Sequence, residues 1–297
     1  MSREAVATLL AGALLGAGLC SCFGPGLLTD GTSVSYGSAA DGALRDGTPL
    51  PVDGDGWEVP PSWRYRHANY GTDELVDALV RTGRRLGREH PGTRMQLGDI
   101  SVRGGGGSAR HRSHQNGRDV DVFLFGADEK GRPLAPLDAM VPYGADGRSK
   151  SWRDADGNSR VAWGRRFDDA RNWATVRALL TDPGVEVQWI FLHDALIRRL
   201  LAFAAEKHED PEVVARAAAV LSQPARALPH DDHMHLRVYC DPSDVPFGCV
   251  DRGPVRWVKK HQKYLGTRAL AHQAGAGGAK LPAVLRWLAL SPSTWRW

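Results

Sequence analysis

The stretch GGGGSARHRSHQNGRDVDVFLF, residues 104–125, decides the fold because it joins a glycine run, two histidines and two aspartates to an apolar run. Residues 120–125 are rich in β-forming side chains, so we expect a strand there. Successive side chains point to opposite faces of a strand, so Asp119 and Asp121 share one face. An aspartate at the start of a buried strand needs a partner. The simplest partner is a cation.

A second stretch, LPHDDHMHLRVYC at residues 228–240, holds further residues of the kinds that bind metals. In a strand with a period of two, His233 and His235 lie on one face, and the apolar residues at alternate positions lie on the other. The two stretches therefore share one design, in which a polar pair stands at the start of an apolar strand.

Two such strands can bring His114, Asp121 and His235 together around one ion. Three nitrogen or oxygen ligands with a water in the fourth position are typical of a catalytic zinc site, so Zn²⁺ is the expected cofactor. Hydrogen-bonded polar residues without a metal, or a solvated histidine patch, are the alternative. The coincidence of both motifs at strand starts favours the metal.

The N-terminus indicates export. Arg3 precedes an uncharged stretch rich in Leu and Ala, residues 5–19, which is shorter than the ~20 residues that a membrane-spanning helix needs. Residues 1–22 are therefore expected to be a signal segment. The sequence LCSC, which ends at Cys22, resembles a bacterial lipoprotein cleavage box and predicts a lipid on Cys22. Signal cleavage without lipidation is the alternative. Either way the predicted location is the periplasm or cell envelope, with an outer-membrane lipoprotein as one form.

The basic charge of the chain is confined to its C-terminal part. The net charge is +4, but residues 252–297 hold nine Lys or Arg and no acidic residue, which leaves 29 basic against 34 acidic residues elsewhere. We therefore expect residues 251–297 to be a separate basic tail. A predominantly acidic remainder argues against a nucleic-acid-binding core, so nucleic acid is not an expected partner.

Cysteine usage agrees with export. Beyond the signal segment only Cys240 and Cys249 remain, and they close a ten-residue loop full of turn residues. In an oxidising compartment such a pair is expected to form a disulfide. Metal binding by the two thiols is the weaker alternative, because the chain has no second cysteine pair to complete a structural zinc site.

The 297 residues, of which 42% are hydrophobic, are enough for a substantial core. Residues 23–62 are rich in Gly, Asp, Pro and Ser and are expected to form an extended strap or linker, followed by a folded domain over residues 63–250. Further elements are expected within that domain: a helix capped by Thr72 over 73–86, a strand over 185–192, a helix over 194–207, and a helix opened by Asp210 and Pro211. The expected fold class is α+β, with a small antiparallel sheet carrying the zinc site and helices packed on its other face.

The two motifs together resemble those of a known family. GGGGSARHRSHQNGRDVDVFL and HDDHMHLRVYC resemble the paired signatures of the penicillin-insensitive murein endopeptidases, which are zinc peptidases related to D-Ala-D-Ala carboxypeptidases and lysostaphin-type enzymes. The resemblance extends, with gaps, over roughly residues 32–250. It implies that His114, Asp121 and His235 are the zinc ligands.

The resemblance also implies roles for three more histidines. His233 matches the histidine beside the metal-bound water, and His111 and His230 match further histidines of the site. No glutamate stands near either motif, so the proton transfers fall to histidine, whose ordinary pKa of ~6.5 suits them. A purely structural role for His111 or His230 stays open.

The function implied is hydrolysis of the peptide cross-link of peptidoglycan, between D-Ala and a diamino acid. Two alternatives stay open: a D,D- or L,D-carboxypeptidase that trims stem peptides, and a noncatalytic peptidoglycan-binding lipoprotein that kept the scaffold. The filled ligand positions argue against the second alternative. The sequence makes no prediction about the oligomeric state.

Overall fold

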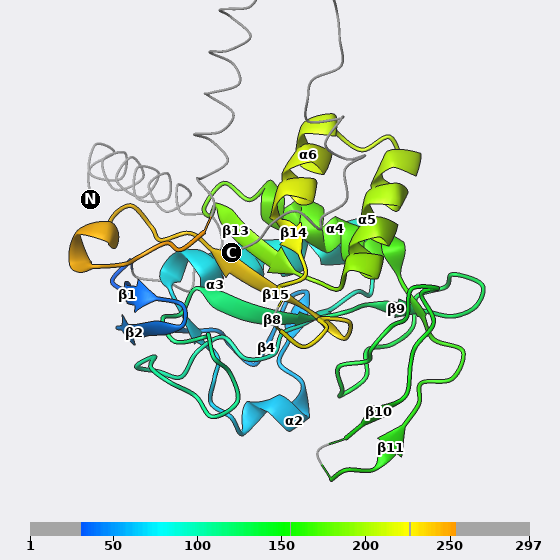
Figure 1. Cartoon of the computed structure of the whole chain (residues 1–297), viewed down its shortest axis with the longest axis horizontal. Helices are drawn as coiled ribbons and strands as arrows, with labels where there is room; N and C mark the ends of the chain where they lie inside the picture. The colour runs from blue at the N-terminus through cyan, green and yellow to red at the C-terminus, as the bar shows by residue number, and fades with distance from the viewer. Residues whose placement is uncertain (1–30, 155, 226, 254–297) are drawn as a thin grey trace, which may run out of the picture.

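The two motifs meet in a four-stranded sheet with the strand order β14-β13-β15-β8 (Figure 1). The computed structural model describes residues 31–154, 156–225 and 227–253. The expected signal segment, the expected lipidation site Cys22 and nearly all of the expected basic tail lie outside these residues. The strands are β8 (Asp119–Phe123), β13 (Val187–Phe191), β14 (Leu221–Ser222) and β15 (His233–Val238).

The register between β15 and β8 places the two motifs side by side. The strands are antiparallel, and His235 stands opposite Asp121 while Leu236 stands opposite Val120. Because side chains alternate along each strand, the polar residues share one face of the sheet and the apolar residues share the other. The expected division of β15 into a histidine face and an apolar face is confirmed, because Met234, Leu236 and Val238 belong to the core.

The sheet is not wholly antiparallel. Strand β13 pairs antiparallel with β15 but parallel with β14. Parallel neighbours need a crossover connection, and the helices α5 (Asp194–Glu206) and α6 (Pro211–Val220) supply it between β13 and β14. The prediction of an antiparallel sheet is therefore correct for three strands and wrong for the edge strand β14, whose two residues carry no strand pattern of their own.

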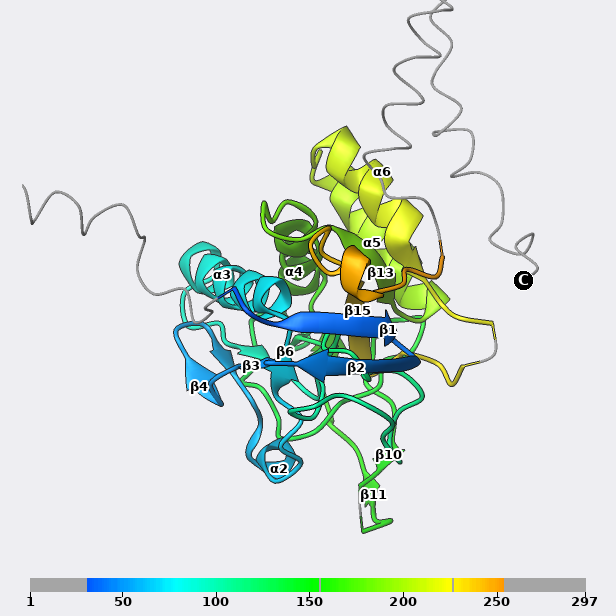
Figure 2. The ribbon, with the colours of Figure 1, turned by 90° about the vertical axis from the view of Figure 1, so that its left-hand side faces the viewer.

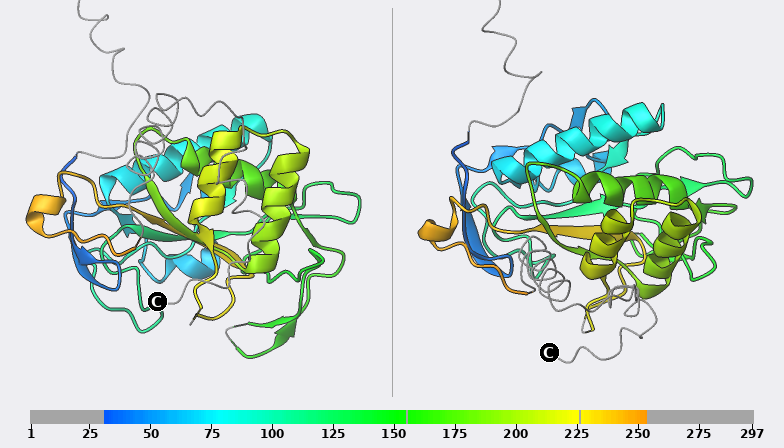
Figure 3. Two further views of the ribbon diagram at one scale, coloured as in Figure 1. Left: turned by 45° about the horizontal axis from the view of Figure 1, so that its top comes forward. Right: turned by 90° about the horizontal axis from the view of Figure 1, so that it is seen from above.

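Helices cover the apolar side of the sheet. Figure 3 shows α5 and α6 side by side over it, and α4 (Asp169–Leu180) packs against both. Helix α3 (Asp73–Glu89) packs against α4 in turn. Apolar residues of the strands and helices form one buried cluster, which includes the fully buried Trp173. The mixed α+β class is confirmed.

The helix starts follow from their capping residues. Thr72 Oγ1 accepts the backbone N–H of Leu75 at the start of α3, as expected, and Asp210 caps α6 ahead of Pro211. Helix α4 begins in the same way, with Asp168 accepting the N–H of Arg171. His193 caps α5 by accepting the N–H of Ala195.

The described part of the expected strap consists of short strands that pair within the domain. Strands β1 and β2 form a hairpin that lies across one side of the molecule (Figure 2), β3 pairs with β6, and β5 pairs with both β4 and β7. Leu50 and Trp57 are buried in the main core. The strand bounds are Val34–Ser38 (β1), Asp41–Arg45 (β2), Thr48–Pro49 (β3), Asp53–Gly54 (β4), Trp57–Glu58 (β5), Tyr70–Gly71 (β6) and Met95–Gln96 (β7).

The remaining elements are short and lie around the sheet. Strand β9 pairs with β12, and β10 pairs with β11 in a hairpin that projects from the body of the molecule (Figure 1). Within the described ranges, no helix is long and apolar enough to cross a membrane. The bounds are Pro61–Arg64 (α2), Gly126–Ala127 (β9), Trp152–Arg153 (β10), Ser159–Arg160 (β11), Arg166–Phe167 (β12) and Val245–Phe247 (the 3₁₀ helix η1).

The expected disulfide is present between Cys240 and Cys249. The backbone of Cys249 pairs with that of Gly37 of β1 in an isolated parallel β-bridge. The backbone N–H of Ser35 donates to the carboxylate of Asp244, which lies in the same loop as Cys249. The cross-linked loop therefore fastens the N-terminal hairpin to the end of β15.

We expect the disulfide to stabilise the fold by about 2–3 kcal/mol, the chain-entropy value for so short a loop. Replacing Cys240 and Cys249 together by alanine should lower the free energy of unfolding in urea by that amount. Reducing the wild type with dithiothreitol should produce the same loss. An unchanged unfolding midpoint after complete reduction would show that the cross-link contributes nothing.

Glu74 in the first turn of α3 should make stability depend on pH. Burial, with smaller contributions from Asp241 and Asp244, raises the pKa of Glu74 from 4.5 to about 7. The unfolded chain therefore releases this proton at lower pH than the folded chain, and stability falls as pH rises from about 4.5 to about 7.

The variant Glu74→Gln should therefore be more stable than the wild type at pH 8, by about 1–2 kcal/mol after allowance for partial exposure, and nearly equal to it at pH 5. Urea unfolding at the two pH values measures this difference. Equal gains at both pH values would mean that the effect is not ionisation of Glu74.

Candidate metal centre

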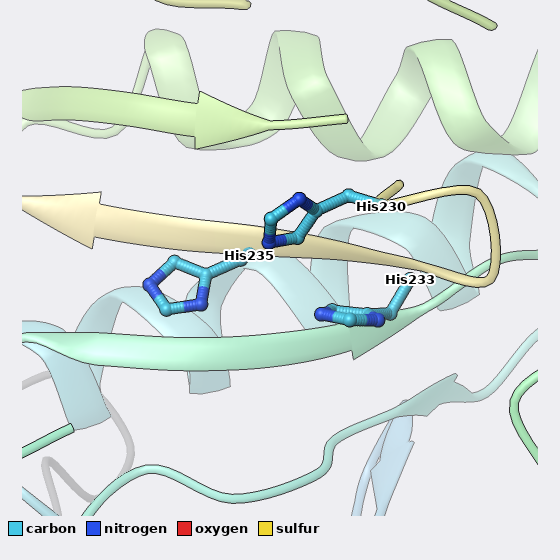
Figure 4. Close-up of side chains that lie close together, drawn as sticks. All are labelled: His230, His233 and His235. Atoms are coloured by element: carbon cyan, nitrogen blue, oxygen red, sulfur yellow. The ribbon is translucent and has the colours of Figure 1, made fainter. Parts of the chain in front are cut away.

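Three polar side chains from two strands and a loop converge on the polar face of the sheet. Asp121 lies on β8, His235 lies opposite it on β15, and His114 precedes β8 in the loop. All three are buried, with 3–6% of their surface exposed. Figure 4 shows the rings of His230, His233 and His235 gathered beside β15 and β8.

The three side chains form an equilateral triangle of possible ligand atoms. His114 Nε2 lies 3.3 Å from Asp121 Oδ1, His235 Nδ1 lies 3.3 Å from the same oxygen, and the two nitrogens lie 3.3 Å apart. Oδ1 of Asp121 is buried and accepts no hydrogen bond from the described residues. When neither ring nitrogen carries a proton, three buried acceptor atoms this close need a cation between them.

The orientation of the two rings is set by their other nitrogens. His114 Nδ1 lies 2.9 Å from the carbonyl oxygen of Ile100, which accepts only, so Nδ1 donates and the lone pair stands on Nε2. His235 Nε2 lies 3.5 Å from a carboxylate oxygen of Asp119 and makes no hydrogen bond within the described residues, so a proton on Nε2 would face Asp119 and leave the lone pair on Nδ1. In His114 the unprotonated nitrogen is therefore the one in the triangle, and the same holds for His235 when its proton is on Nε2.

His233 lies at the edge of this triangle. Its Nε2 is 3.5 Å from Asp121 Oδ1, and its Nδ1 is 2.6 Å from Asp232 Oδ1. Burial opposes protonation, but the carboxylates of Asp121 and Asp232 outweigh it and raise the pKa of the His233 imidazole to about 9.

His230 stands in the loop before β15. Its ring centroid lies 5.2 Å from that of His233 and 5.9 Å from that of Phe191. Burial and the neighbouring histidines lower the pKa of its imidazole to about 4. His230 is therefore neutral where His233 is charged.

His111 lies beside His114 and is held by Asp99, a residue outside the two motifs. Its Nε2 lies 2.8 Å from Asp99 Oδ2, and its ring centroid lies 4.3 Å from that of His114. Asp99 is buried and also accepts from Arg66. Burial opposes ionisation of Asp99, but His111 and Arg66 outweigh it and lower its pKa.

The structure thus brings together all six expected site residues. Three clusters could each hold a metal ion: His111 with His114 and Asp121, His114 with Asp119 and His235, and His230 with His233 and His235. Sequence reasoning missed Asp99 and Asp232. Asp232 stands within the second motif, next to His233, whereas Asp99 gives no local signal because its partner is twelve residues away.

The triangle fits a tetrahedral metal. Bonds of 2.0–2.1 Å at tetrahedral angles place neighbouring ligand atoms about 3.3–3.4 Å apart. The three measured separations of 3.3 Å meet this requirement. Two imidazole nitrogens and one carboxylate oxygen are also ligands that Zn²⁺ accepts, and they leave a fourth position open.

A sheet with helices on its apolar face and a buried His–Asp–His cluster on its polar face is typical of a metal-dependent hydrolase. Comparison with known proteins identifies the family. The family described as penicillin-insensitive murein endopeptidase matches residues 35–262, so the chain belongs to that family of metallopeptidases. The resemblance seen in the sequence motifs is confirmed, and the chain is a peptidase.

Individual relatives agree with the family match. The chain is 26% identical over 229 residues to a penicillin-insensitive murein endopeptidase of Haemophilus influenzae. This match covers 76% of the chain and 70% of the relative. It is 34% identical over 95 residues to proteins of the same name in Salmonella paratyphi C and Salmonella arizonae, which covers 32% of this chain and 34% of each relative. The chain therefore spans about a third of the length of these Salmonella relatives.

Proposed function

We propose that this chain is a zinc-dependent endopeptidase of the bacterial cell envelope that hydrolyses peptidoglycan cross-links between D-Ala and a diamino acid. The observation that carries the proposal is the triangle of His114, Asp121 and His235, whose three separations of 3.3 Å suit zinc, in a chain of the murein endopeptidase family. The names of the relatives favour an endopeptidase over a carboxypeptidase.

In this proposal His114, Asp121 and His235 hold the ion. Bound zinc would lower the pKa of a coordinated water to ~7 and polarise the scissile carbonyl. His233 would transfer protons beside the metal, because its Nε2 lies 3.5 Å from the ligand Asp121 and Asp232 orients its ring. A proton on His233 is suited to the leaving amine.

His230 and His111 would have supporting roles. His230 stays neutral at pH 7, so a proton on one of its ring nitrogens can donate a hydrogen bond to a developing oxyanion. His111 is tied to Asp99 by a 2.8 Å contact, which fixes its ring beside that of His114.

Digestion of purified peptidoglycan sacculi tests the proposed function. An endopeptidase should convert cross-linked muropeptide dimers into monomers without shortening the stems. Chelation of zinc should stop the conversion, and added zinc should restore it. Shortened stems would instead identify a carboxypeptidase. Binding to sacculi without any product would identify a noncatalytic wall-binding protein. His90→Ala, at the end of α3 and outside the cluster, is the control histidine variant.

A pair of variants separates the proposed ligand from the proposed proton-transfer group. His235→Ala removes one of three ligands and should lose both zinc and activity. His233→Ala should keep about one zinc per chain and lose turnover by ~10²–10⁴, the usual effect of removing a general acid or base. Metal analysis and muropeptide assays on the same preparations measure both. Loss of zinc from both variants to the same degree would contradict this division of roles.

A further inference from the structure

Asp119 is a fully buried carboxylate that the proposed chemistry does not use. It lies on the same face of β8 as Asp121, opposite Arg237 of β15, and its exposed fraction is 0%. Its Oδ1 accepts from Arg237 Nε at 2.6 Å, and its Oδ2 accepts from the second guanidinium nitrogen at 3.0 Å. A two-point ion pair of this kind fixes the plane of the carboxylate as well as its place.

The same carboxylate contacts both of the histidines in the triangle. Oδ2 accepts the backbone N–H of His114 at 3.0 Å and lies 3.5 Å from Nε2 of His235. His114 has φ of +65°, a left-handed conformation that residues with a β-carbon seldom adopt. The bond to Asp119 stabilises this conformation, which turns the His114 ring toward the sheet.

The contact with His235 acts on its ring. Nε2 makes no hydrogen bond within the described residues, and the Asp119 carboxylate 3.5 Å away would attract a proton on it, which would leave Nδ1 with its lone pair in the triangle. The opposite tautomer would point its Nδ1–H at Asp121. It would also place the lone pair of Nε2 against the Asp119 carboxylate, which is unfavourable. Asp119 therefore favours the tautomer that can bind a metal.

We propose that Asp119 is a positioning residue of the metal centre, which holds the backbone of His114 and the ring of His235 in their metal-binding arrangement. The inference rests on the proposed function, because it takes His114 and His235 as ligands. Arg237 acts through Asp119 by holding both of its oxygens.

Asp119 could instead be a ligand, since it also lies in a cluster with His114 and His235. Its hydrogen bonds argue against that role. Both oxygens of Asp119 already accept hydrogen bonds, whereas Oδ1 of Asp121 accepts none from the described residues and lies 3.3 Å from each ring nitrogen. Asp121 is therefore the ligand, and Asp119 contacts the backbone N–H of His114 and the outer ring nitrogen of His235.

The test compares zinc affinity in two matched variants. Asp119→Asn keeps the shape of the side chain but loses its charge, and it should weaken zinc binding by about 10–100-fold, the usual effect of losing such a partner. Asp168→Asn is the control, because Asp168 is also buried, pairs with Arg171 Nε at 2.8 Å, and accepts the Arg171 N–H at 2.9 Å. Its affinity should stay at the wild-type value. Competition with a chromophoric chelator measures the zinc affinity of the wild type and of both variants.

Three outcomes are decisive. Wild-type zinc affinity in Asp119→Asn would overturn the inference alone, provided that the wild type binds zinc. A loss as complete as that in Asp121→Ala would also overturn it, because Asp119 would then be a ligand. A wild type that binds no zinc would overturn the proposed function as well.

A measurement on the wild type covers the case in which Asp119→Asn does not fold. In an NMR spectrum of the zinc-loaded protein with ¹⁵N-labelled histidine, the ring proton of His235 should be on Nε2 and that of His114 on Nδ1. A His235 proton on Nδ1 would overturn the inference, because Asp119 would then not set the ring.

Discussion

The antiparallel pairing of β15 with β8 is the constraint on which the rest of the structure depends. Its register sets His235 opposite Asp121 and, two residues on, Arg237 opposite Asp119. A shift of β15 by one residue would turn His235 and Arg237 into the core and the apolar residues of β15 out to the site, because side chains alternate along a strand. The core beneath the sheet therefore specifies the geometry of the cluster above it.

Much of this arrangement could be predicted from the sequence, because it depends on local patterns. The alternation in β8 and β15 gives the faces of the sheet, and Thr72 and Asp210 mark the starts of α3 and α6. The convergence of His114, Asp121 and His235 followed from the shared design of the two motifs. These features need only the period of a strand or the chemistry of a helix cap.

What escaped prediction depends on contacts between distant segments. Strand β14 has only two residues, and it is defined by its pairing with β13 rather than by a pattern of its own. Asp99 meets His111 across the glycine loop, and Leu50 and Trp57 of the expected strap enter the main core. Only the folded chain brings these pairs together.

The environments of His230 and His233 argue for different roles in spite of their similar positions. Their rings lie 5.2 Å apart, yet the pKa of His233 is raised to about 9 and that of His230 is lowered to about 4. The difference arises because carboxylates flank His233, whereas His230 is partly buried beside Phe191 and its pKa is lowered by desolvation and by the neighbouring histidines. A cation bound to Asp121 would cancel part of the rise at His233, but the contact with Asp232 would remain. Neighbouring groups whose pKa values are pushed apart mark the division between proton donor and neutral hydrogen-bonding group, so His233 is better suited than His230 to carry the proton.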